Sequence, residues 1–149
     1  MKNYKEILES AVRNEVEAYE FYKGAAEKVA EENLKSTFED LAKEELKHKA
    51  LLEGYLKEPP EALKFDETKD YKVAETMDER SLSTDMEFKD AIALAMKREE
   101  EAMDMYQQFA DSSEDPAQKE TFEELAKMEQ GHKTRLEEIY TNVAFIEAW

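Results

Sequence analysis

Apolar residues recur along this chain at alternating steps of three and four, in four separate stretches. An α-helix turns once every 3.6 residues, so this spacing collects the apolar side chains on one helical face. The pattern predicts four helices, at roughly 4–31, 34–57, 85–111 and 116–141. Residues suited to capping precede or open them, namely Asn3, Asn33, Thr84 and Asp115.

The four helices are two copies of one unit. Residues 15–53 and 99–137 align without a gap at a separation of 84 residues, and 17 of the 39 aligned positions are identical. The connection inside each copy is short, so its two helices run antiparallel. The sequence therefore predicts two duplicated helical hairpins, 4–57 and 85–141.

The stretch between the hairpins, 58–84, is polar and acidic, and Pro59 and Pro60 end the helix before it. A helix of about 25 residues is about 38 Å long, and some 27 extended residues, at about 3.3 Å each, easily cross that length. A long crossover between two antiparallel hairpins is the ferritin-like topology. We therefore expect an all-α, ferritin-like four-helix bundle in one domain, with a C-terminal tail, 142–149, of undecided conformation.

Composition excludes several classes of protein. A net charge of −17 argues against binding to nucleic acid or to an anionic membrane surface. The absence of cysteine excludes disulfides, thiolate metal sites and iron–sulfur centres on this chain. No stretch approaches the ~20 apolar residues of a membrane span, and the start has no apolar signal core. We expect a cytoplasmic protein.

Ionisable residues interrupt the four apolar seams. Four of them are glutamates, and burying an unpaired carboxylate costs several kcal/mol. Protonation or a basic partner would compensate, but the matched seam positions carry no Lys or Arg. Two divalent cations would neutralise four carboxylates, and each of the two histidines follows a seam glutamate by three residues, on the same face. Carboxylate with imidazole suits iron, manganese or zinc. We predict a two-metal site ligated by Glu15, Glu45, His48, Glu99, Glu129 and His132.

The spacing also suggests roles within this site. Glu45 and Glu129 each lie beside a histidine and are predicted to bridge the metals, whereas Glu15 and Glu99 are predicted to be terminal ligands. Six side chains leave coordination positions open to a substrate oxygen, which is typical of a reactive site.

Several neighbouring residues have less certain roles. The tyrosines two turns after the terminal glutamates either donate hydrogen bonds to ligand carboxylates or are core aromatics. Four further glutamates are interpreted as surface residues rather than ligands. The two tyrosines are Tyr22 and Tyr106, and the four glutamates are Glu17, Glu44, Glu100 and Glu101.

The segments NEVEAYEFY (14–22), KEELKHK (43–49), REEEAMDMY (98–106) and KMEQGHK (127–133) resemble the rubrerythrin family of the ferritin-like superfamily. The resemblance implies that the six ligands hold two iron ions, with zinc or manganese as possible substitutes. It further implies a di-iron centre that reduces hydrogen peroxide or dioxygen, in a homodimer. Full-length members add a rubredoxin-like domain with four cysteines, and this chain has none. An external electron donor, such as a rubredoxin-like protein, is therefore expected.

A second departure from the family leaves the function open. Peroxide-reducing members carry an extra ligand glutamate where this chain has Ala102. The leading hypothesis is an oxidoreductase acting on peroxide or dioxygen. The alternative is a ferroxidase or iron-handling protein, for which Fe(II) is the substrate and which the acidic surface favours. A third hypothesis is a metal-stabilised bundle with a binding or sensing role and no turnover.

Overall fold

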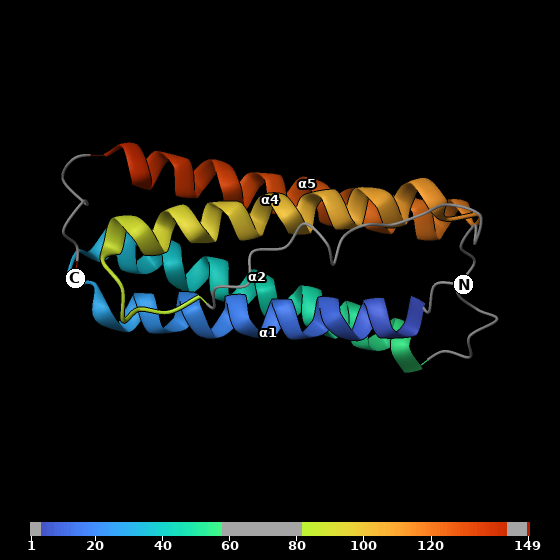
Figure 1. Cartoon of the computed structure of the whole chain (residues 1–149), viewed down its shortest axis with the longest axis horizontal. Helices are drawn as coiled ribbons and strands as arrows, with labels where there is room; N and C mark the ends of the chain where they lie inside the picture. The colour runs from blue at the N-terminus through green and yellow to red at the C-terminus, as the bar shows by residue number, and fades with distance from the viewer. Residues whose placement is uncertain (1–3, 58–81, 143–148) are drawn as a thin grey trace.

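The computed structural model of this chain describes residues 4–57, 82–142 and 149. These residues form an all-helical four-helix bundle (Figure 1), which confirms the predicted fold class. The helices are α1 (Tyr4–Lys28), α2 (Glu32–Lys57), α4 (Phe88–Ser112) and α5 (Pro116–Thr141). Each predicted helix is present, with ends that differ from the prediction by at most three residues. Within the described residues, no helix combines the length and apolar character needed to cross a membrane.

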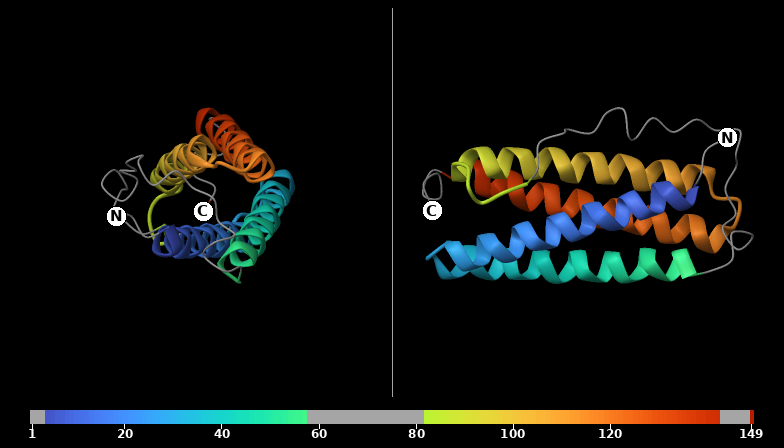
Figure 2. Two further views of the ribbon diagram at one scale, coloured as in Figure 1. Left: turned by 90° about the vertical axis from the view of Figure 1, so that its right-hand side faces the viewer. Right: turned by 60° about the horizontal axis from the view of Figure 1, so that its bottom comes forward.

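The order of the helices is that of a ferritin-like bundle. α1 and α2 form one antiparallel hairpin, and α4 and α5 form the other (Figure 1). α2 ends at one end of the bundle and α4 begins at the other, so these two helices run in the same direction. Seen along the bundle, the four helices surround a common axis (Figure 2). Most of the predicted crossover and tail, 58–81 and 143–148, lies outside the described residues.

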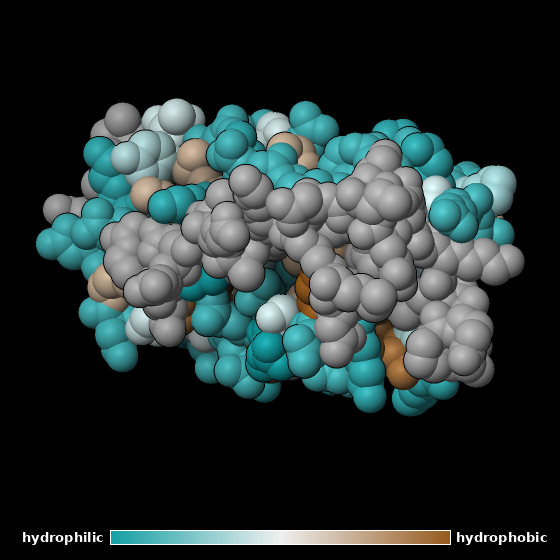
Figure 3. All heavy atoms as spheres, turned by 45° about the vertical axis from the view of Figure 1, so that its right-hand side comes forward, coloured by the Kyte–Doolittle hydropathy of each residue, from teal (hydrophilic) through white to brown (hydrophobic). Residues whose placement is uncertain are grey.

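The apolar core is divided into two clusters. One gathers around Phe38 and Phe88, whose ring centroids lie 6.4 Å apart. The other gathers around Phe109 and Phe122, at 5.2 Å. Every helix contributes to both clusters, and the buried ionisable residues of each helix lie between its two contributions. The outer surface in view is mostly hydrophilic (Figure 3), as expected for amphipathic helices.

Trp149 packs against the first cluster. Its indole Nε1 donates a hydrogen bond to the carbonyl oxygen of Met86 at 2.9 Å. Its ring meets Phe88 edge-on, with centroids 4.8 Å apart, and Lys28 Nζ lies 5.2 Å from the ring centroid. The last residue of the tail therefore covers this end of the core near the start of α4.

Helix capping follows the prediction only in part. Asp115 accepts a hydrogen bond from the Gln118 backbone N–H at 3.0 Å, ahead of Pro116 in the first turn of α5. The predicted cap at Asn33 is wrong, because α2 begins earlier and the Glu31 carboxylate accepts from Leu34 N–H at 2.6 Å. The predicted cap at Thr84 is also wrong, because α4 begins only at Phe88. Asn3 lies outside the described residues.

We expect Asp115→Ala to lower the free energy of unfolding by about 1 kcal/mol, because the first turn of α5 loses its acceptor. Asn33→Ala is the matched control, since this exposed residue caps nothing in α2. Urea denaturation followed by circular dichroism measures both variants. Equal midpoints for the two variants would contradict the role of Asp115 as a cap.

Candidate metal centre

The six predicted ligands lie together between the two apolar clusters. α1 and α4 each supply one glutamate, whereas α2 and α5 each supply a glutamate and, one turn later, a histidine. Because i and i+3 lie on the same face of a helix, each Glu–His pair points into the bundle. None of the six residues is more than 3% exposed; they are Glu15, Glu45, His48, Glu99, Glu129 and His132.

Their ligand atoms form two groups that overlap. Glu15 and His48 belong to one group, and Glu99 and His132 belong to the other. Both groups also contain Glu45 and Glu129, and within each group the ligand atoms lie within 4.8 Å of one another. Two positions that share a pair of carboxylates can accommodate two metal ions bridged by those carboxylates. This is the arrangement expected from the sequence for Glu45 and Glu129.

Each histidine contacts the glutamate of the opposite hairpin. His48 Nδ1 lies 2.7 Å from Glu129 Oε1, and His132 Nδ1 lies 2.8 Å from Glu45 Oε1. The two imidazole rings are stacked, with centroids 5.8 Å apart and planes 11° from parallel. Both Nδ1 atoms therefore face the carboxylates, which is the side on which a metal would bind.

Two tyrosines hold the predicted terminal glutamates. The Tyr22 hydroxyl donates to Glu99 Oε1 at 2.5 Å, and the Tyr106 hydroxyl donates to Glu15 Oε1. Burial raises the pKa of both hydroxyls well above the usual value, and the nearby carboxylates raise it further. Both groups therefore remain donors at neutral pH. Of the two roles left open by the sequence, the structure favours support of the carboxylates, and each tyrosine serves the opposite hairpin.

Burial and neighbouring charges shift the pKa values of several groups in the cluster. Burial, followed by the charges of Glu99 and Glu15, raises the pKa of Glu129 well above its usual value. Burial would also raise the pKa of Glu99, but hydrogen bonds with Glu129 and His132 outweigh it and lower the value. Burial would lower the pKa of His132, but its contacts with Glu99 and Glu44 raise it. The raised pKa values of Glu129 and His132 favour protonation of both groups, which would reduce the repulsion among the carboxylates.

Two buried carboxylate oxygens of the cluster have only long contacts. Among the described residues, Glu15 Oε2 and Glu99 Oε2 make no hydrogen bond of normal geometry, and the nearest histidine Nδ1 atoms lie 3.7 and 3.5 Å away. Buried acceptors left unpaired are costly, so such atoms call for a further partner. Carboxylate oxygens and imidazole nitrogens are the donors that iron, manganese and zinc accept. The residues present therefore fit a pair of divalent metal ions.

Glu44 was interpreted from the sequence as a surface residue, and the structure shows more. Its Oε2 lies 2.5 Å from His132 Nε2 and 3.5 Å from Arg135 Nη1, and its side chain is 26% exposed. Glu44 is therefore not a candidate ligand but the hydrogen-bond partner of one. Only its position beside Glu45 hinted at this role, because the contact depends on how α2 packs against α5.

A small cavity of about 30 Å³ reaches the cluster between α1 and α4. Its lining includes ligand glutamates, the apolar side chains of Ala18 and Ala102, and the polar side chains of Asn14, Glu17, Arg98 and Glu101. Glu17 and Arg98 form an ion pair at 3.6 Å. The volume is sufficient for a water-sized molecule, so a very small molecule has room beside the glutamates.

We expect Tyr22→Phe to destabilise the protein by about 1–3 kcal/mol, because Glu99 loses its buried donor. Tyr19→Phe is the matched control on the same helix, and we expect it to change stability by no more than about 0.5 kcal/mol, as for an ordinary partly exposed position. Urea denaturation in the presence of a chelator measures both. Similar losses in the two variants would show that the Tyr22 hydroxyl does not stabilise the cluster.

Comparisons with known proteins agree with this geometry. The sequence matches the rubrerythrin family over residues 6–140, which include both hairpins and all six candidate ligands. The structure is similar to that of a hypothetical protein from Pyrococcus furiosus, with a TM-score of 0.73 and 29% identity over 99% of this chain and 94% of the other. No curated protein matches the chain. The chain belongs to the rubrerythrin family.

Proposed function

We propose that this protein is a non-haem di-iron oxidoreductase of rubrerythrin type, which reduces hydrogen peroxide or dioxygen with electrons from an external donor. The observation that carries the proposal is the pair of overlapping ligand groups that share Glu45 and Glu129. Membership of the rubrerythrin family supports iron as the metal.

Each ligand has a role in this proposal. Glu45 and Glu129, which both groups contain, would bridge the two iron positions. Glu15 and His48 would complete one position, and Glu99 and His132 the other. Two ferrous ions carry four positive charges, which balance the four carboxylates in a part of the core that water hardly reaches.

When bound, two ferrous ions would supply one electron each. Two electrons and two protons reduce one molecule of hydrogen peroxide to two molecules of water. The chain's own contribution is to hold the ligands and to limit access. Tyr22 and Tyr106 fix the two terminal glutamates. The apolar clusters lie on both sides of the ligands, and the cavity lined by Ala18 and Ala102 leaves room for only a very small molecule.

The proposal includes a separate electron donor. The chain contains no cysteine, so it cannot hold a rubredoxin-like iron itself. A rubredoxin-like protein or a small reductant would return the two electrons after each turnover. The expected homodimer and cytoplasmic location stay predictions.

The alternative is a ferroxidase or iron-handling role, in which Fe(II) is the substrate. The observation that favours it is the acidic lining of the cavity, which includes the partly exposed Glu17 and Glu101. The net charge of −17 would also attract cations to the protein. Ala102 lines the same cavity and offers no additional ligand. Both functions use the same six residues, so they are separated by the fate of the iron.

The metal site is tested first by stoichiometry. We expect the metal-free protein to take up two Fe(II) per chain under anaerobic conditions, and Glu45→Ala or Glu129→Ala to abolish paired binding, because each removes an oxygen donor common to both positions. Glu100→Ala is the matched control, since this side chain is exposed and pairs with Lys133. Elemental analysis after desalting gives the number of iron ions bound per chain. Two tightly held ions in Glu45→Ala would show that this residue is not a bridge.

The reaction is tested by mixing the protein carrying two Fe(II) with one equivalent of hydrogen peroxide or with oxygenated buffer, followed by near-ultraviolet absorption. We expect faster oxidation by peroxide, with both irons retained and reducible again by an external donor. Iron that leaves after oxidation, or that accumulates beyond two per chain, would support the ferroxidase instead. Failure to bind two metals at all would contradict both functions.

A further inference from the structure

The two histidines have different surroundings, although the sequence repeat makes them equivalent. His132 Nε2 contacts Glu44 Oε2 at 2.5 Å, and Arg135 Nη1 lies 3.5 Å from the same oxygen. The 84-residue repeat places Met128 at the position equivalent to Glu44, and Leu51 at the position equivalent to Arg135. A charged pair on one side of the site is thus replaced by two apolar residues on the other.

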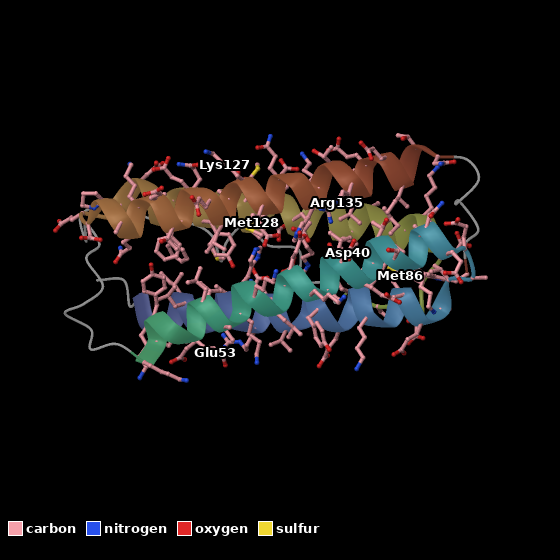
Figure 4. The ribbon with its side chains drawn as sticks, turned by 180° about the vertical axis from the view of Figure 1, so that it is seen from behind. Asp40, Glu53, Met86, Lys127, Met128 and Arg135 are labelled. Atoms are coloured by element: carbon pink, nitrogen blue, oxygen red, sulfur yellow. The ribbon has the colours of Figure 1, made fainter. Side chains whose placement is uncertain are left out.

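The consequence is visible at His48. Its ring is buried, yet among the described residues its Nε2 has no hydrogen-bond partner. Met128 and Leu51 are respectively 38% and 39% exposed, so their side chains are partly turned to solvent. A thioether is in any case only a weak acceptor. Figure 4 views this side of the bundle and labels Met128 and Arg135 on α5.

A carboxylate behind a ligand histidine affects how that histidine binds metal. When Nδ1 faces the metal, the proton of the neutral ring must be on Nε2. A carboxylate that accepts this N–H fixes the tautomer and the ring orientation and makes the imidazole a better donor. Removing such a partner typically costs 10–100-fold in metal affinity. Glu44 provides this support to His132, and Arg135 lies beside Glu44, whereas none of the described residues supports His48 in this way.

We propose that Glu44 is a positioning residue that makes the two metal positions unequal, so that the position completed by His132 binds a divalent ion more tightly than the position completed by His48. This proposal rests on the proposed two-metal site but not on peroxide or oxygen as its substrate. It concerns the order and strength of metal binding, which the symmetric set of six ligands would not predict.

Co(II) is a suitable probe, because it binds the same donors as Fe(II) and does not react with oxygen as readily. Calorimetric titration of the metal-free full-length chain should show two steps separated by about 10–100-fold in affinity. The chain contains only two histidines, so each cobalt-bound ring gives its own shifted, exchangeable N–H signal in the proton spectrum. We expect the signal of His132 to appear first and to exchange more slowly, since its Nε2–H is bonded to Glu44.

Two substitutions test whether Glu44 causes the difference in affinity, because each gives one half of the repeat the residue found in the other half. Glu44→Met should weaken the tighter step about 10–100-fold and abolish the slow exchange of the His132 signal. Met128→Glu, at an exposed position, should strengthen the weaker step and give His48 a slowly exchanging signal. Glu53→Met is the matched control, because it removes a negative charge from α2 at a residue whose ion pair is with Lys49. A purely electrostatic effect of charge would weaken both steps together.

The outcomes separate this proposal from the proposed function. Equal affinities in the unmodified protein, or stepwise binding that Glu44→Met leaves unchanged, would overturn the role of Glu44 while leaving the two-metal site intact. Failure to bind two Co(II) would instead contradict the metal centre itself. Circular dichroism of each variant establishes that the bundle is folded, and the exposed Met128→Glu variant still tests the proposal if Glu44→Met does not fold.

Discussion

The burial of four carboxylates in the middle of a helical bundle is the constraint on which the rest of this structure depends. An unpaired buried charge costs several kcal/mol, and a whole domain is stable by only about 5–15 kcal/mol. Four such groups therefore cannot persist without compensation. The protein supplies it with two imidazoles, two tyrosine hydroxyls and a raised pKa at Glu129. Unpaired oxygens remain on Glu15 and Glu99, and a metal pair would satisfy them.

The compensating contacts join the two hairpins. Tyr22 of the first hairpin donates to Glu99 of the second, and Tyr106 of the second donates to Glu15 of the first. The histidines likewise contact glutamates of the opposite hairpin. Separating the hairpins would remove these donors from the glutamates. The polar layer thus makes the two halves dependent on each other, whereas the apolar clusters on either side supply the non-directional part of the packing.

Much of this arrangement could be predicted from the sequence, because it depends on periodicity within single helices. The steps of three and four fix which face of each helix is buried, and glutamates on that face identify the site. Capping was less predictable, because a cap depends on the residue at which the helix begins. A two-residue shift at the start of α2 replaces Asn33 by Glu31 as the capping residue.

Contacts between helices also could not be predicted from the periodicity of the sequence. The sequence left Tyr22 as either a donor to a ligand carboxylate or a core aromatic, and its hydrogen bond to Glu99 depends on how the two hairpins pack together. Glu44 lies beside a ligand in sequence and appeared to be a surface residue. Its contact with His132 arises because α2 and α5 are neighbours, and a repeat comparison would have shown only that Met128 differs.

The sequence repeat also shows which features of the site can vary independently. The candidate ligands are two glutamates and one histidine from each half, and the repeat makes them equivalent. Several residues around them differ between the halves, including Glu44 with Met128 and Asn14 with Arg98. Because the ligands are symmetric and their neighbours are not, two metal positions could share bridging carboxylates and still differ in their affinity for metal. In the proposed two-metal site, the six ligands provide two positions, and the residues around them make those positions unequal.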